Sequence, residues 1–142
     1  MSRDTFRAAV FYYQDFSRGE CLNVGVVLAS PQTKFCKARM LSLGELHPIV
    51  QMFGDTLENA EWYARVLLEY SLLADEAKEL GRDFSLRFDH PHIFTALFGR
   101  NNETSCLGWR DGASGLVTKS PQETLDYYFE IMVRRPTREV KP

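Results

Sequence analysis

Two stretches of the chain, residues 5–13 (TFRAAVFYY) and residues 22–30 (LNVGVVLAS), decide the fold. The first is rich in aromatic and β-branched residues, and its alternation with a period of two predicts a strand. The second is nearly continuous in apolar residues, as expected for a strand buried on both faces. Asp, Ser and Gly in residues 14–19 predict a turn between them. Residues 34–41 alternate as a third strand, so the chain opens with an antiparallel meander.

The middle of the chain has the pattern of one long amphipathic helix. Asp55 followed by Glu58 resembles a capping box, and Gly81 is a stop signal. Apolar residues between them recur at spacings of three and four, which predicts one buried helix face. These residues are Leu57, Ala60, Tyr63, Ala64, Leu67 and Ala74. Residues 43–53 predict a short helix that is interrupted near Pro48.

The second half of the chain predicts shorter elements. Residues 84–88 alternate as a strand, and residues 91–98 predict a short helix with Pro in its first turn and Gly after its end. Residues 105–110 and 115–118 predict two short strands around an Asp-Gly turn. Ser-Pro-Gln-Glu at the start of residues 120–133 is a capping box. The apolar stripe expected on this last helix consists of Leu125, Tyr128, Phe129, Met132 and Val133.

These elements predict an α+β fold. In this fold the long helix and the C-terminal helix cover one face of the sheet, and the short late strands extend it. We expect a single domain over residues 1–135, followed by a flexible basic tail over residues 136–142. The 142-residue length suits one domain of this kind.

Composition excludes several classes of function. The chain carries 17 basic and 19 acidic residues, a formal net charge of -2, so no strong field favours nucleic acid or a membrane surface. No stretch approaches the roughly 20 apolar residues of a membrane span. Cys21, Cys36 and Cys106 are odd in number and widely spaced, which indicates reduced thiols in a cytoplasmic protein rather than disulfides or a Cys-x-x-Cys clamp.

Arg18, Glu20 and Asn23 form the first candidate site, because three polar residues lead directly into an apolar strand. One interpretation is structural: a buried Arg18–Glu20 pair braces the hairpin and Asn23 caps loose backbone groups. The other is functional: the three side chains bind a ligand or a partner. Regular alternation places Glu20 and Asn23 on opposite faces. Gly25 in mid-strand predicts a bulge or a close approach of another segment.

Trp109 and Arg110 form the second candidate, since both residue types are enriched in interface hot spots. An exposed tip around the Asp-Gly turn would present them to a partner. In the alternative interpretation, which we favour, Trp109 lies in the core. The aromatic run of residues 11–13 resembles a base-stacking platform, but no basic residue neighbours it, and core packing is favoured.

A metal site is not expected, and neither is a cofactor. His90 and His92 have an H-x-H spacing, but Pro91 between them favours a helix start, where the two imidazoles diverge. Asp89 then reads as a helix cap, and only His47 remains as a distant further ligand. The chain contains no nucleophile elbow, phosphate-binding loop or dinucleotide fingerprint.

Residues 18–28 (RGECLNVGVVL), after an aromatic-rich strand, resemble the motif of a bacterial family known as domain of unknown function 3037. A second, looser likeness covers residues 115–133. The resemblance implies a small bacterial protein without an agreed activity. It also implies a paired system, because some members are encoded beside a kinase-like protein similar to the HipA toxins. This is an association and not a mechanism.

Three functions therefore remain open from the sequence. The first is a non-enzymatic interaction module with a protein partner, which the resemblance implies is kinase-like; assembly into a homo-oligomer also stays open. The second is a small enzyme or ligand-binding domain that uses Arg18, Glu20 and Asn23. The third, a weak nucleic-acid binder that uses the basic tail and residues 11–13, is disfavoured by the net charge.

Overall fold

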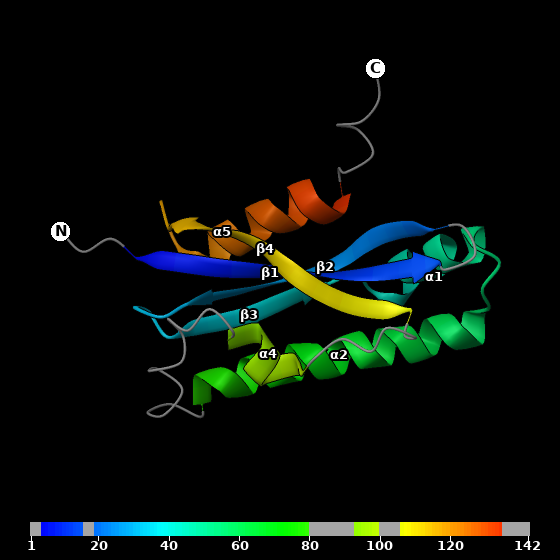
Figure 1. Ribbon diagram of the computed structural model, residues 1–142, viewed down its shortest axis with the longest axis horizontal. Coiled ribbons are helices and arrows are strands. Elements are labelled where there is room, and N and C mark those ends of the chain that lie inside the picture. The colour runs from blue at the N-terminus through cyan, green and yellow to red at the C-terminus, as the bar shows by residue number, and fades with distance from the viewer. Residues whose placement is uncertain (1–3, 16–18, 80–92, 100–105, 135–142) are drawn as a thin grey trace, which may run out of the picture.

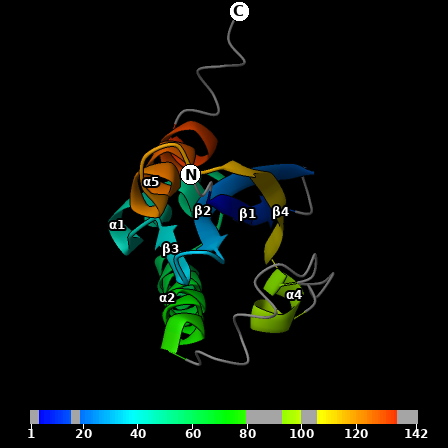
Figure 2. The same ribbon diagram turned by 90° about the vertical axis from the view of Figure 1, so that its left-hand side faces the viewer.

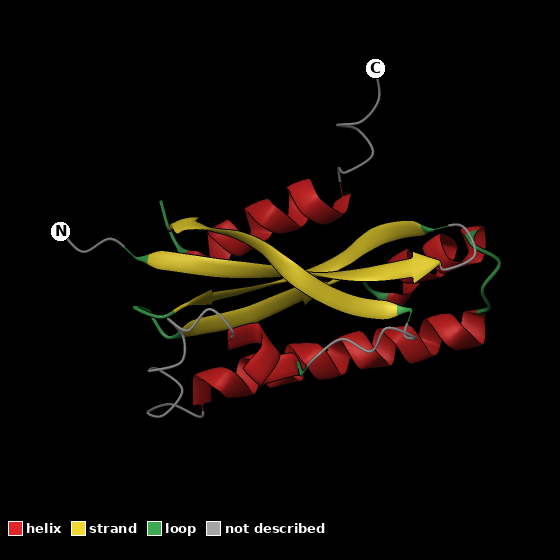
Figure 3. Cartoon of the chain, in the orientation of Figure 1, coloured by secondary structure: helices red, strands yellow, loops and turns green. Residues whose placement is uncertain are grey.

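The computed structural model describes residues 4–15, 19–79, 93–99 and 106–134. Within these ranges, an antiparallel sheet of four strands, in the order β3-β2-β1-β4, forms the centre (Figures 1 and 3). The strands are β1 Thr5–Asp15, β2 Glu20–Ser30, β3 Phe35–Met40 and β4 Leu107–Leu116. The helices are α1 Leu43–Met52, α2 Leu57–Glu79, α4 Ile93–Phe98, α5 Pro121–Phe129 and the π-helix η1 Glu130–Arg134. The α+β fold with an opening three-stranded meander is confirmed.

Strand β2 lies inside the sheet and is covered on both faces. Every residue from 24 to 30 is buried, as its continuous apolar sequence predicted. Helix α5 packs on one face and α2 on the other (Figure 1). The prediction that both helices share one face is therefore wrong, because consecutive residues of β1 and β2 offer apolar side chains to both sides.

Ring contacts from β1 show the two layers directly. Phe6 lies 5.4 Å from Tyr128 of α5, between ring centroids, whereas Phe11 lies 5.0 Å from Tyr70 of α2 on the other face. Helix α4 lies under β4, on the same side of the sheet as α2 (Figure 2), and Phe98 of α4 is 5.1 Å from Phe11. The core therefore has two halves, one on each side of the sheet.

Strand β4 is one continuous strand, and the prediction of two short strands around an Asp-Gly turn is wrong. Asp111 pairs with Ala9 and Ser114 pairs with Arg7, so β4 has one residue more than β1 over this interval. The extra residue makes a β-bulge, which accommodates Gly112 without reversing the chain. A Cβ atom at Gly112 would lie 3.2 Å from Val10 and 3.3 Å from the Ala8 carbonyl, so the glycine permits this close approach.

The sequence analysis missed the cap of α1 and misplaced the cap of α2 by one residue. Ser42 caps α1 with a full capping box, and the helix continues past Pro48, so the predicted interruption is wrong. Pro48 removes only one backbone donor. Thr56 caps α2, since its hydroxyl accepts from the amide of Asn59 at 3.1 Å. The predicted cap, Asp55, lies one residue earlier and has another role.

The later helices agree with the sequence where the structure describes them. Helix α4 ends at Gly99, whose φ of 76° is the left-handed conformation expected there. Ser120 caps α5, with its hydroxyl accepting from the amide of Glu123, and the predicted apolar stripe packs inward. The predicted strand at residues 84–88 and the basic tail lie outside the described residues. Within the described part of the chain, no helix is long and apolar enough to cross a membrane.

Candidate functional site

The fold brings together Asn23 and Arg110, which the sequence analysis had placed in two separate candidate sites. The Arg110 guanidinium donates from Nη2 to the Asn23 side-chain oxygen at 2.9 Å, and its carbon lies 5.5 Å over the Tyr12 ring centroid. The Cys21 sulfur lies 3.9 Å from Arg110 Nη1. We call this group the Arg110 site. It faces the side of the sheet that carries α5 and η1.

Asn23 positions the arginine through a second hydrogen bond to the π-helix. Its side-chain nitrogen donates to the carbonyl of Met132 in η1 at 2.8 Å. One amide group thus holds the guanidinium with its oxygen and the C-terminal helical segment with its nitrogen. Both ends of Asn23 are satisfied, and this fixes the orientation of its side chain. A single-turn π-helix of this kind is frequent at functional positions.

Strand register explains why these residues meet. Tyr12 lies opposite Asn23 on one side and opposite Gly108 on the other. A Cβ atom at Gly108 would lie 2.5 Å from the Tyr12 hydroxyl oxygen, so a side chain there would displace the Tyr12 ring. The Tyr12 ring therefore lies over the backbone of β4, next to Arg110.

The register also shifts by one residue at Val24, next to Gly25. This β-bulge confirms one part of the prediction for Gly25. The predicted close approach is confirmed as well, because a Cβ atom on Gly25 would lie 2.1 Å from the Met40 sulfur and 3.2 Å from the Arg39 carbonyl.

Arg110 has no carboxylate partner among the described residues, and it is exposed. Arg39 provides the contrast on the same face of the sheet. Its Nη1 is 3.0 Å from Asp126, and its guanidinium carbon lies 4.3 Å over the Phe129 ring centroid. Arg39 is thus internally neutralised, whereas Arg110 is held in place with its charge available. A positioned guanidinium of this kind is suited to bind a carboxylate or phosphate.

The other predicted site residues lie elsewhere. Glu20 is exposed at the start of β2, on the face opposite Asn23, so the interpretation as half of a buried ion pair is wrong. Arg18 lies outside the described residues. Trp109 is 8% exposed and its indole nitrogen donates to the Gly99 carbonyl at 3.0 Å. The core interpretation of Trp109 is confirmed, and the exposed tip is wrong.

Asp55 forms a second polar cluster, which the sequence analysis missed. Its Oδ2 accepts from the hydroxyls of Tyr13 and Tyr63, both at 2.9 Å. Its Oδ1 accepts from the Thr56 amide at 2.9 Å and from the Asn59 side chain at 2.6 Å. One carboxylate thus connects β1, the loop before α2 and the first two turns of α2. The only sequence signal was an Asp before a helix, which reads as a cap.

Electrostatics in this Asp55 cluster favour a charged carboxylate and neutral phenols. Burial acts to raise the pKa of Asp55, but the hydrogen bonds from Asn59, Thr56, Tyr13 and Tyr63 outweigh it, and the pKa lies below its ordinary value. Burial, with the Asp55 hydrogen bond and charge adding to it, raises the pKa of Tyr13 above its ordinary value. The pKa of Tyr63 is raised by burial, with Cys106 and Asp55 adding to it. The Asp55 carboxylate makes its hydrogen bonds within the protein and holds these elements of the fold together.

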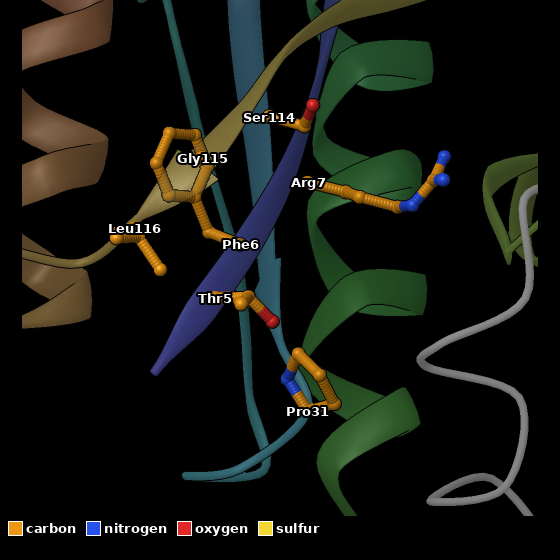
Figure 4. Close-up of a pocket in the computed structure, with 7 residues that line it drawn as sticks. All are labelled: Thr5, Phe6, Arg7, Pro31, Ser114, Gly115 and Leu116. Atoms are coloured by element: carbon orange, nitrogen blue, oxygen red, sulfur yellow. The ribbon is translucent and has the colours of Figure 1, made fainter. Parts of the chain in front are cut away.

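Surface cavities lie at both ends of β1. A shallow cavity of about 230 Å³ adjoins the Asp55 cluster and is lined by Tyr13, Gln14, Asp15, Phe53, Gly54, Asp55 and Cys106. A larger cavity of about 390 Å³ lies where β1 starts and β4 ends (Figure 4). There Phe6 and Arg7 extend from β1 in opposite directions, and Leu116 closes one side. This larger cavity contains no cluster of titratable groups among its described lining residues.

The metal hypothesis is not tested, because residues 89–92 lie outside the described residues. Among the residues that are described, no group of three His, Cys, Asp or Glu side chains is close enough to hold a metal ion. His47 lies on α1.

The thiols of Cys21 and Cys36 are expected to differ strongly in reactivity. Cys21 is exposed, whereas Cys36 is buried, and burial with the nearby Asp75 raises the pKa of Cys36 to about 12. Brief iodoacetamide treatment near neutral pH should modify Cys21 in the folded protein and Cys36 only after unfolding, as peptide mass spectrometry would show. Equal labelling rates for these two thiols in the folded protein would contradict the buried position of Cys36.

Comparisons with protein families, with curated proteins and with solved structures found no match to this chain. The resemblance of residues 18–28 to the domain of unknown function 3037 stays a prediction.

Proposed function

We propose that this protein is a non-enzymatic interaction module that binds a partner protein through the Arg110 site. The observation that carries the proposal is an exposed arginine that is held by Asn23 and has no carboxylate partner among the described residues. Arginine anchors of this kind, fixed before binding, contribute strongly at interfaces because little side-chain entropy is lost. Asn23 and Met132 supply this fixation.

The Asp55 cluster is not suited to catalysis. The Asp55 carboxylate accepts four hydrogen bonds within the protein, so it is committed to the fold. The low pKa of Asp55 also opposes a role as a general acid or base near neutral pH, where such a group needs a pKa close to the working pH. The resemblance implies a kinase-like protein, and we propose this class of protein as the partner.

Co-purification from the native host should separate the candidates. Tagged wild-type protein is expected to retain a stoichiometric protein partner, and Arg110→Ala should lose it, with mass spectrometry identifying what binds. Arg65→Ala is the matched control, since Arg65 is an exposed arginine on α2, on the other side of the sheet. It should retain the partner. Equal recovery with Arg110→Ala, or no partner while all forms are folded, would overturn the proposal and favour a small anionic ligand.

A further inference from the structure

The outer face of α2 carries apolar side chains where a surface helix is ordinarily polar. Leu67 and Ala74 are buried and mark the inner face, which packs toward the sheet. In contrast, Trp62 is 55% exposed, Leu68 is 58% exposed and Leu72 is 51% exposed. Figures 1 and 2 show no described element beyond α2 on the side away from the sheet. Three large apolar residues are therefore left uncovered by the part of the chain that the structure describes.

The exposed apolar residues of α2 form one band along the helix. Residues three or four positions apart are neighbours on a helix surface. Trp62, Arg65, Leu68 and Leu72 follow one another at these spacings. Arg65 interrupts the apolar character only at its charged end, because the stem of an arginine side chain is aliphatic. We call these four residues the α2 band, which spans about 15 Å along the helix axis.

Acidic residues surround the α2 band. Five exposed carboxylates lie on the helix, and none of them makes an ion pair with another described residue. They belong to Glu58, Glu61, Glu69, Asp75 and Glu76. Arg65 is the only exposed basic residue among the described side chains of α2. The outer face of the helix is thus apolar along the band and negatively charged around it.

We propose that the outer face of α2 is a second docking surface, which binds a basic amphipathic helix of another protein. This inference goes beyond the proposed function, because it involves neither Arg110 nor Asn23. The apolar stripe of the partner helix would cover Trp62, Leu68 and Leu72, and its Lys or Arg residues would meet the surrounding carboxylates. Helices recognised in this way use anchors at spacings of three and four. The 23 residues of α2 provide a straight support of about 34 Å.

Charge argues against two other occupants of this surface. A second copy of this chain would bring the carboxylates of two α2 helices together, and like charges oppose association. An anionic membrane surface would repel the same carboxylates. A basic helix is attracted by them, and the attraction also favours rapid association. The charge of the surface therefore determines the charge of its partner.

Titration of the full-length protein with a model peptide tests this inference. The probe is a peptide of about eighteen residues that contains only Leu and Lys, with Leu on one helical face. Binding should shift the emission of Trp62 to shorter wavelength, because the exposed indole becomes covered. Trp109 is 8% exposed and should contribute a constant background, and Trp62→Phe should abolish the shift. We expect a dissociation constant on the order of 10 μM, since one helix face is a small interface.

Matched charge variants locate the binding surface. Glu69→Lys/Glu76→Lys should weaken peptide binding at least about tenfold, because the peptide would meet like charges beside the α2 band. Glu20→Lys/Glu123→Lys is the control, since it makes the same change in net charge at exposed residues of β2 and α5. It should bind the peptide nearly as the wild type does. Circular dichroism verifies that both variants are folded.

Matched leucine variants test the apolar contact. Leu68→Ser should also weaken binding about tenfold, because burial of this leucine contributes to affinity. Leu116→Ser replaces a leucine of β4 that is 49% exposed and should leave binding unchanged. Arg110→Ala should bind the peptide as the wild type does. A failure of the proposed function would therefore leave the result at α2 unaffected, and the two can be distinguished.

Four results would overturn the inference. The first is the absence of a Trp62 shift in folded protein at millimolar peptide. The second is equal affinity of the peptide for Glu69→Lys/Glu76→Lys and the wild type. The third is equal affinity for a Leu and Glu peptide of the same apolar pattern, which would show that charge does not select the partner. The fourth is a dimer of the wild-type protein alone that Leu68→Ser dissociates, since it would assign this face to a second copy.

Discussion

Replacement of Asp55 by alanine is expected to lower the free energy of unfolding by about 3 kcal/mol. The buried hydroxyls of Tyr13 and Tyr63 would lose their common acceptor, and α2 would lose the hydrogen bonds at Thr56 and Asn59. An unsatisfied buried hydroxyl costs about 1–3 kcal/mol, and the loss of a charge-assisted network adds to that cost. Chemical denaturation followed by circular dichroism measures the change.

Matched variants separate the carboxylate from its surroundings. Asp55→Asn keeps the shape and one acceptor, so its cost should be smaller than that of Asp55→Ala. Thr56→Ala removes only the cap hydroxyl and should cost about 1 kcal/mol. If Asp55→Ala costs no more than Thr56→Ala, the Asp55 cluster does not stabilise the fold.

The Asp55 cluster also determines the expected sign of a pH effect. The folded-state pKa of Asp55 is lowered, so its contribution to stability is present above its unfolded pKa of about 4 and is lost as the pH falls below that value. The raised pKa values of Tyr13 and Tyr63 act at the other end, where stability falls as the pH rises above about 10. Asp55→Ala should have a shallower acid limb than the wild type.

Replacement of Phe11 by alanine is expected to cost about 4 kcal/mol. Phe11 is 1% exposed in the centre of β1, with its ring centroid 5.0 Å from that of Tyr70 and 5.1 Å from that of Phe98. Its side chain connects α2 and α4 with the sheet. Truncation removes this apolar contact and leaves a cavity in a close-packed layer, and both effects destabilise. The midpoint of urea denaturation should fall without a change in slope.

Tyr127→Ala is the control for Phe11→Ala, because Tyr127 is an aromatic residue that is 60% exposed on α5. It should cost about 0.5 kcal/mol or less. Phe11→Leu should fall between the two alanine variants, since it retains part of the apolar volume. A Phe11→Ala protein as stable as Tyr127→Ala would show that α2 and α4 do not pack on β1 as described.

The residues expected to stabilise the fold and those of the Arg110 site, proposed to bind a partner, lie on different sides of the sheet. Phe11 and the Asp55 cluster lie on the α2 side of the sheet, whereas Arg110 and Asn23 lie on the α5 side. Variants of Phe11 and Asp55 should therefore lower stability while the folded fraction still binds a partner through Arg110. Arg110→Ala should do the reverse, because the exposed guanidinium makes no ion pair among the described residues.

The sequence by itself determined the elements whose signals are local. The period of two in β1, the continuous apolar run of β2, the helical spacing in α2 and the Ser-Pro start of α5 all depend on neighbouring residues, and each predicted element is present. Core packing of Trp109 was also favoured correctly. Such patterns are readable because backbone geometry repeats over a few residues.

Only the tertiary structure decided which distant residues meet. Asn23 and Arg110 are 87 positions apart and join because both flank β1 in the strand order. Tyr13 and Asp55 are 42 positions apart, and their contact depends on how the loop before α2 returns to the sheet. The Asp-Gly pair in β4 has the local signal of a turn, but pairing with β1 absorbs it as a bulge. Strand order and packing decide these contacts, and the neighbours of a residue in sequence carry no information on strand order. At the Asp-Gly pair, strand pairing overrides the local preference for a turn.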